Sequence, residues 1–203
     1  NVGKSTLLNS LVGEKISIVS RKAQTTQKNT TGVITKDNSQ LIFFDTPGLN
    51  KIEKNIRIYE TFKTVAENVD VLIYMVDNTK KSQSIDDQFR NWLNNNENKF
   101  KKKILIINKI DCIEKVNLFE ITKKINGVVN FDETFFISLS KKSGMERFLN
   151  WVEKQAYSNE WLFQQTYKSN ISKKNFLSEL TREKVFEYIH EEIPYNLEIK
   201  TDY

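Results

Sequence analysis

The sequence of 203 residues predicts an α/β fold, a doubly wound domain built on a largely parallel sheet. Continuous apolar runs of strand length cover residues 69–77, 103–108 and 134–138. Segments with the apolar spacing of helices lie near residues 52–68, 84–95, 114–126 and 144–156. Apolar strands that alternate with helices are typical of parallel sheets covered on both faces. Ligands of such folds bind at the carboxyl ends of the strands.

The chain opens with "NVGKST", and a helical pattern over residues 5–12 follows at once. Gly3, Lys4 and Ser5 match the end of a Gly-x-x-x-x-Gly-Lys-Ser/Thr loop. In that loop, backbone N–H groups and the lysine bind phosphates and the hydroxyl binds Mg²⁺. The first glycine and the preceding strand would lie upstream of Asn1, so we expect a fragment without that strand. The expected phosphate-binding residues are Asn1, Val2, Gly3, Lys4, Ser5 and Thr6.

A second motif follows residues 32–45, which predict two strands joined by the polar turn "KDNS". In "DTPGL", the Asp45 carboxylate can hold a Mg²⁺-bound water and the Gly48 N–H can meet a γ-phosphate. We therefore assign to the nucleotide the residues Asp45, Thr46, Pro47, Gly48 and Leu49.

The polar segment "SRKAQTTQKNTTG" separates these two motifs. In this setting it is expected to supply the threonine that completes the Mg²⁺ shell when nucleotide binds. Thr26 is the candidate and Thr25 the alternative, because the sequence does not fix which neighbour points inward.

The third motif, "NKID", follows the strand at residues 103–108. Asp111 can accept hydrogen bonds from guanine N1–H and the 2-amino group, which adenine does not offer in that place. A buried carboxylate left unpaired makes such discrimination worth a factor on the order of 10⁴. Asn108 belongs to the same loop, and the stem of Lys109 is expected to cover the base.

The three motifs in this order predict a GTPase that hydrolyses the γ-phosphate of GTP. The expected catalytic residues are Lys4, Thr26, Asp45 and Gly48, with Mg²⁺ as cofactor. Leu49 stands where many regulatory GTPases carry the glutamine that orients water, so we expect slow intrinsic turnover.

The composition sets broad limits. The net charge is +5, and the run "KFKKK" at residues 99–103 is interpreted as a solvated loop rather than a phosphate-binding patch. The single cysteine, Cys112, excludes a disulfide within these residues and is expected to be a small buried side chain. Trp92, Trp151 and Trp161 are expected to pack in the protein. No apolar run approaches the roughly 18 residues of a membrane span, which favours a cytoplasmic protein.

The character of the chain changes after residue 156. Residues 157–171 form a polar connector with aromatic side chains, and Ser172 is expected to cap a helix. "YNLEIKTDY" alternates as a strand does. We interpret this part as the start of a second domain. The helix presents an expected apolar face of Phe176, Leu177, Leu180, Val185, Phe186 and Ile189, with Ile171 placed to pack against Phe176.

The stretches "NVGKSTLLNSLVGEKISIVSRKAQTT", "DTPGL", "NKID" and "EIPYNLEIK" resemble the Era family of GTPases over essentially the whole chain. The resemblance implies a GTPase domain at residues 1–156, a linker at 157–171, and the start of a KH-type RNA-binding domain at 172–203. The Gly-x-x-Gly loop with which a KH domain clamps nucleotides is not within the sequence.

The resemblance also implies partners: GTP and GDP, 16S ribosomal RNA and the precursor 30S subunit. It implies a monomer in the cytoplasm with peripheral association with the inner membrane. The family's base-contacting loop maps to Ser138-Leu139, with Ser140-Lys141 as the alternative register. Related GTPases bind K⁺ through an asparagine at the position of Asn1, so Asn1 is a candidate K⁺ ligand and a loop-stabilising role is the alternative. Gln27 replaces an arginine usual in the family.

Two other hypotheses stay open at this point. One is a related GTPase of tRNA modification or a tandem-domain ribosome factor, although no second "GKS" loop occurs in the sequence. The other is a piece that binds nucleotide weakly or not at all, because half of the phosphate loop would lie upstream of Asn1.

Overall fold

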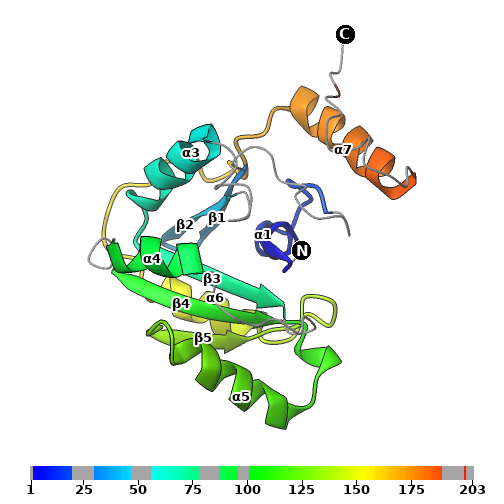
Figure 1. Ribbon diagram of the computed structural model, residues 1–203. Helices are drawn as coiled ribbons and strands as arrows, with labels where there is room; N and C mark the ends of the chain where they lie inside the picture. The colour runs from blue at the N-terminus through cyan, green and yellow to red at the C-terminus, as the bar shows by residue number, and fades with distance from the viewer. Residues whose placement is uncertain are drawn as a thin grey trace. The chain divides into compact units, whose positions relative to one another are not determined.

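The computed structural model describes residues 2–19, 30–46, 56–77, 87–95, 101–188 and 199 (Figure 1). The chain divides into two compact units, and each is described by itself. The first unit contains Gly3–Ile58 and Val152–Tyr203. The second contains Tyr59–Trp151 together with Val2.

In the first unit, helix α1 (Lys4–Val12) packs on an antiparallel hairpin of β1 (Thr30–Lys36) and β2 (Ser39–Asp45). The turn between the strands lies in the predicted "KDNS" stretch. A small apolar core joins the helix to the hairpin. Its members are Leu8, Val12, Ile16, Ile34 and Phe43.

Gly32 of β1 allows the close approach of α1 to the hairpin. A Cβ atom at this position would lie 2.5 Å from Leu8 Cδ1 and 2.8 Å from Val12 Cγ2. Both distances are too short for carbon atoms, so a side chain here would push the helix away from the strand.

The C-terminal part of the first unit runs along the free edge of β1. The Val33 N–H donates to the Lys168 carbonyl at 2.8 Å. The amide of Gln40 donates to the Phe163 carbonyl at 2.9 Å and accepts from the Phe163 N–H at 3.0 Å. The segment after residue 157 is therefore held on the hairpin by one main-chain hydrogen bond and two hydrogen bonds of the Gln40 side chain before it enters its helix.

Helix α7 (Lys173–Tyr188) begins where the sequence predicts. The Ser172 hydroxyl accepts a hydrogen bond from the Asn175 N–H at 3.2 Å, which confirms the predicted cap.

The apolar residues of α7 lie on a helix, as their spacing predicts, but those that the structure describes are not fully buried. Phe176, Leu180 and Val185 are only half-buried, and Leu177 is 49% exposed. The buried positions of the helix are instead Arg182 and Glu183. Helical spacing alone could not show this, because the partners of Glu183 come from the other end of the chain. Residues 186 and 189 lie outside the side chains that the structure describes.

The second unit contains the predicted parallel sheet. Its strands β3 (Val71–Asp77), β4 (Lys102–Asn108) and β5 (Glu133–Phe136) pair in the order β3-β4-β5. The four residues Ile104 to Ile107 of the central strand have no exposed surface. A strand covered on both faces therefore accounts for this continuous apolar run, as predicted.

Helices of the second unit pack through aromatic side chains. Phe62 of α3 (Ile56–Ala66) contacts Trp92 of α4 (Asp87–Asn95), with ring centroids 4.9 Å apart. Phe135 of β5 contacts Phe148 and Trp151 of α6 (Met145–Glu153) at 5.4 and 5.6 Å. α5 (Lys115–Asn126) buries Ile121 and Ile125.

These contacts confirm the packing roles expected for Trp92 and Trp151. Trp161 departs from the expectation, because 42% of its surface is exposed. It lies in the connector, between the bonded Phe163 and the end of α6, where the described residues bury little apolar surface.

Part of the "KFKKK" run is not a loop. Lys102 and Lys103 begin β4, while Lys101 is exposed and pairs with Asp70 at 2.6 Å. Asp132 accepts from the Lys103 N–H at 2.7 Å and from Lys102 Nζ at 3.2 Å. Burial works to raise the pKa of Asp132, but these hydrogen bonds and the lysine charges hold that pKa below its ordinary value. In the described part of the chain, no helix has the length and apolar character to cross a bilayer.

Candidate nucleotide-binding site

Gly3 turns the chain into α1. Its backbone is left-handed, with φ 106° and ψ 18°, a conformation that glycine adopts without the strain that a Cβ would bring. No side chain caps the first turn of the helix, which begins at Lys4. The first N–H groups of a helix point away from its own backbone, so this turn is suited to an anion such as a phosphate.

Ser5 and Asp45 lie together at one end of the first unit. The Ser5 hydroxyl donates to Asp45 Oδ2 at 2.5 Å, and the Ser17 hydroxyl lies 3.4 Å from the same oxygen. Asp45 ends β2 and is only 5% exposed. The structure thus brings together the serine predicted to bind Mg²⁺ and the carboxylate predicted to hold its water.

This donor set fits Mg²⁺. The described residues contain no group of three or more His, Cys, Asp or Glu side chains that could enclose a metal ion. Mg²⁺ does not require one, because it is usually held by one or two carboxylates, waters and substrate phosphates. A hydroxyl and a carboxylate at hydrogen-bond distance are hard oxygen ligands of the kind that it prefers.

In the second unit, Asn108 fastens the loop that carries Asp111. Its Nδ2 donates to the Val2 carbonyl at 2.9 Å, and its Oδ1 accepts from the Leu139 N–H at 3.3 Å. Asn108 is only 3% exposed. The side chain predicted to contact nucleotide therefore joins the start of the chain to the loop after β5.

Lys109 is held by a residue to which the sequence analysis gave no role. Its backbone is left-handed at φ 62°, and its Nζ lies 2.6 Å from Asp77 Oδ2. Asp77 ends β3 and is 5% exposed. An acidic residue at the carboxyl end of an apolar strand was the available signal, the same signal that identified Asp45.

Two serines after β5 hold the Asp111 carboxylate. The Ser138 hydroxyl donates to Oδ1 at 2.5 Å, and the Ser140 hydroxyl donates to Oδ2 at 3.1 Å. The hydrogen bond from Ser138 is the main reason why the pKa of Asp111 is below its ordinary value of 3.8. Asp111 is exposed in the structure, which corrects the expectation of a buried carboxylate, and its side chain is open to a ligand.

The loop after β5 contains both pairs of residues proposed to contact the base, Ser138-Leu139 and Ser140-Lys141. Ser138 is fully buried and exchanges two backbone hydrogen bonds of 3.1 Å with Ser143. Leu139 is half-buried, and Ser140 and Lys141 are exposed. Side chains from both registers therefore reach Asp111, and Ser138 is the one fixed by the backbone.

Cys112 corrects an expectation. It is exposed, and its Sγ lies 3.7 Å from Asp111 Oδ2. The cysteine ends η2 (Ile110–Cys112), a short helical turn that buries none of its residues. Its position on this surface turn, not its residue type, decides its exposure.

Of the remaining predicted site residues, the structure describes three, and six lie outside the described residues. Val2, Thr6 and Thr46 are described and half-buried. The predicted residues outside the described ones are Asn1, Thr25, Thr26, Pro47, Gly48 and Leu49.

Comparison with known proteins gives a family. Residues 1–109 match the family model described as 50S ribosome-binding GTPase. The whole chain aligns with GTPase Era of Sinorhizobium medicae at 32% identity and with GTPase Era of Agrobacterium fabrum at 32%. The chain spans 65% and 63% of the lengths of these two relatives.

Solved structures give the same result for the fold. A variant of Aquifex aeolicus Era bound to GDP and AlF4⁻ matches with a TM-score of 0.81 and 30% identity. Era in complex with MgGDPNP and nucleotides 1506–1542 of 16S ribosomal RNA matches with a TM-score of 0.82 and 31% identity. Each match covers 96% of this chain and 66% of the other.

These matches confirm the α/β GTPase fold and the resemblance predicted from the sequence. The chain belongs to the family of 50S ribosome-binding GTPases and is similar to the Era GTPases along its whole length.

Proposed function

We propose that the protein binds GTP with Mg²⁺, hydrolyses it to GDP and phosphate, and acts in assembly of the small ribosomal subunit by binding 16S ribosomal RNA. The single observation that carries the nucleotide assignment is the state of Asp111. An exposed carboxylate, held in place by hydrogen bonds from Ser138 and Ser140, is suited to accept two N–H groups of guanine.

The phosphates are assigned to the start of α1. We propose that the N–H groups of the first turn of α1 bind phosphate oxygens and that Lys4 neutralises the β- and γ-phosphates. Ser5 would hold Mg²⁺ directly and Asp45 through a water, in place of their present mutual hydrogen bond. Bound Mg²⁺ supplies charge neutralisation on the phosphates.

The catalytic part of this assignment relies on charge stabilisation. Lys4 and the helix N–H groups stabilise negative charge on the transferred phosphoryl group. Leu49 cannot orient the attacking water, so the proposed turnover is slow. Thr26 and Gly48 complete the proposed catalytic set, with Thr25 as the alternative to Thr26.

The wider function is drawn from the relatives. Era in complex with MgGDPNP and a 16S ribosomal RNA segment supports both the nucleotide and the RNA for this chain. We propose residues 1–156 as the GTPase domain, 157–171 as the linker and 172–203 as the start of a KH-type domain. The cytoplasm, with peripheral inner-membrane association, is the proposed location.

K⁺ is the proposed second cation, with Asn1 as its ligand. Hydrolysis should be faster in K⁺ than in Na⁺ at equal ionic strength. Equal rates in the two salts would remove this assignment and leave the rest of the proposal unchanged.

The test of the proposed function uses the full-length protein. We expect binding of GDP and GDPNP, slow release of phosphate from GTP, and binding of an RNA of nucleotides 1506–1542 in preference to a scrambled RNA of the same length. Phosphate release that persists in Lys4→Met would contradict the catalytic assignment. Equal affinity for the scrambled RNA would contradict the RNA assignment alone.

A further inference from the structure

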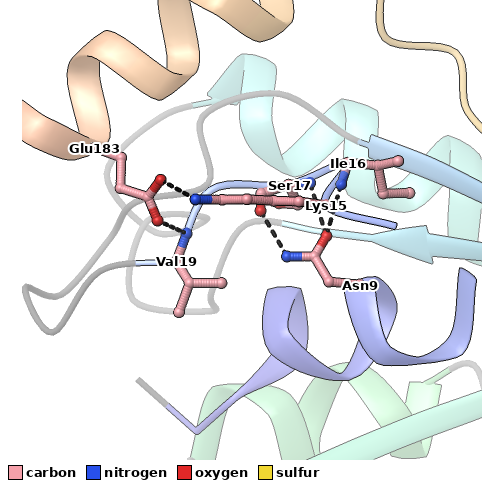
Figure 2. Close-up of polar contacts among 6 residues, drawn as sticks. All are labelled: Asn9, Lys15, Ile16, Ser17, Val19 and Glu183. Carbon is pink, nitrogen blue, oxygen red and sulfur yellow. Dashed lines mark hydrogen bonds and ion pairs between the residues drawn. The ribbon is translucent and has the colours of Figure 1, made fainter. Parts of the chain in front are cut away.

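Glu183 of α7 carries a buried negative charge that serves no part of the proposed reaction directly. It is 4% exposed. Its Oε1 accepts from the Val19 N–H at 3.1 Å, and its Oε2 pairs with Lys15 Nζ (Figure 2). A buried carboxylate is costly in free energy unless hydrogen bonds or an ion pair compensate it. The contacts of Glu183 with Val19 and Lys15 are therefore strongly favoured in the folded protein.

The two partners of Glu183 are the two ends of one short loop, residues 15–19. Asn9 of α1 holds the same loop from its other side, as Figure 2 shows. Its Oδ1 accepts from the Ile16 and Ser17 N–H groups, both at 2.9 Å, and its Nδ2 donates to the Ser17 carbonyl at 2.7 Å. Five polar contacts therefore fix the loop between α1 and α7.

Ser17 connects this loop to the proposed Mg²⁺ ligands. It is 5% exposed, and its hydroxyl faces Asp45 Oδ2 at 3.4 Å. That oxygen is the acceptor of the Ser5 hydroxyl. A distance of 3.4 Å is longer than the usual hydrogen bond between oxygens of about 2.5–3.0 Å, so small shifts of the loop decide whether Ser17 bonds to Asp45.

We propose that Glu183 is a positioning residue for the Mg²⁺ end of the nucleotide site. It acts through the loop at residues 15–19, which sets the place of Ser17 and through it the orientation of the Asp45 carboxylate. The inference rests on the proposed function and deepens it, because it gives the C-terminal helix a regulatory contact with the nucleotide site.

The coupling must work in both directions. If the contact of α7 with the loop favours binding of Mg²⁺ and nucleotide, their binding must strengthen the contact of α7 by the same factor. Residues that orient a metal ligand commonly change metal affinity about 10- to 100-fold when they are replaced. Ser17 faces the proposed metal ligand Asp45, so replacing Ser17 should change the affinity within this range. Glu183 acts through the loop and so one step farther away, and its replacement should change the affinity about 5-fold.

The chain offers a matched control. Glu14, next to the loop, pairs with Lys168 of the C-terminal segment. Both side chains are about half exposed, at 55% and 47%. Glu14→Gln therefore removes an ion pair between the same two parts of the chain, but it leaves the contacts of the loop with Glu183 and Asn9 in place.

The first experiment measures the Kd of GDPNP for the full-length protein, once with Mg²⁺ and once with a chelator. We expect Ser17→Ala to lose about 10-fold and Glu183→Ala about 5-fold, both only in Mg²⁺. Glu183→Gln keeps an oxygen for the Val19 N–H but loses the ion pair with Lys15, so its loss should lie between wild type and Glu183→Ala. Glu14→Gln should stay close to wild type.

The second experiment measures hydrogen exchange of the backbone amides of α7 with and without Mg²⁺ and GDPNP. In wild type we expect exchange to slow on binding. By reciprocity this slowing should be at most about 5-fold, and in Ser17→Ala, which leaves the contacts of α7 with Lys15 and Val19 in place, it should be lost.

Two outcomes would overturn the inference alone. One is that the wild-type protein binds GDPNP, but Glu183→Ala loses the same factor of affinity in Mg²⁺ as in chelator. The other is unchanged slowing of α7 exchange in Ser17→Ala. Failure of the wild-type protein to bind GDPNP would instead overturn the proposed function, and this inference with it.

Discussion

Two carboxylates are assigned to the nucleotide, and their surroundings differ in almost every respect. Asp45 in the first unit is 5% exposed, and its described partners are hydroxyls of the same unit. Asp111 in the second unit is exposed, and two serine hydroxyls hold it in its ionised form. The buried carboxylate is suited to hold a cation in a fixed place, whereas the exposed one is suited to accept hydrogen bonds from an incoming base.

The comparison also shows how each side chain is supported. Asp45 depends on α1 and the hairpin, which meet closely at Gly32. Asp111 depends on the turn at residues 138–144, in which Gly144 has φ 79°. Damage to the first support should therefore affect the binding of Mg²⁺, and damage to the second should affect recognition of the base.

The largest expected effect is on base recognition. Asp111→Asn replaces an acceptor of two N–H groups by a side chain with one acceptor and one donor group. We expect the affinity for GDP to fall by a factor on the order of 10³–10⁴. Affinity for xanthosine diphosphate, which carries an oxygen in place of the 2-amino group, should rise. Titration calorimetry with the two nucleotides measures both, and unchanged GDP affinity would remove Asp111 from the site.

The second prediction compares two glycines. In Gly144→Ala the new Cβ would lie 2.2 Å from the Phe136 carbonyl oxygen, in a left-handed backbone. We expect a loss of about 3 kcal/mol, combining overpacking with the cost of that conformation. Gly32→Ala meets the ends of flexible side chains and should cost about 1–2 kcal/mol. Urea unfolding midpoints give both values, and the reverse order would contradict the proposed supports.

The third prediction concerns the pair at the Mg²⁺ end. Ser5→Ala removes a 2.5 Å hydrogen bond from a buried carboxylate, so the nucleotide-free protein should lose about 2 kcal/mol of stability. Ser10→Ala, an exposed position on the same helix, should change it by less than about 0.5 kcal/mol. Thermal unfolding distinguishes the two. Equal losses in both variants would mean that the Ser5 bond contributes nothing.

The smallest effect is on the titration of Asp111. Because the pKa of Asp111 is lower in the folded protein, the carboxylate stabilises the fold above pH 3.8, and this contribution is lost as the pH falls through the folded pKa. Ser138→Ala should raise the pKa of Asp111 toward 3.8, and Ser140→Ala should raise it less. An NMR titration of the carboxyl carbon measures both shifts. A pKa that stays unchanged in Ser138→Ala would contradict the support drawn from this serine.

Features that depend on neighbours in the sequence could be predicted. The apolar run of β4 predicted a strand covered on both faces, since only such a strand needs no polar side, and Ile104 to Ile107 are fully buried. Ser172 predicted the start of α7 because a cap acts on the next three residues. Asp45 and Asp111 could be identified because they belong to the motifs "DTPG" and "NKID", which stand at the ends of strands.

Features that depend on distant partners could not be predicted. Glu183 is buried because Lys15 and Val19, more than 160 positions away in the sequence, supply its contacts. The role of Asp77 was not predicted, because its partner Lys109 lies in a motif more than 30 positions away in the sequence. The hydrogen bond of Asn108 to Val2 depends on the folded position of the chain's first residues. In each case a polar side chain bonds to a group far away in the sequence, which the local pattern does not reveal.

The central claim is that Asp111 selects guanine. The most direct test is the binding of GDP and ADP to the full-length protein in Mg²⁺. The account predicts that GDP binds more tightly by a factor on the order of 10⁴. Equal affinity for the two nucleotides would contradict it.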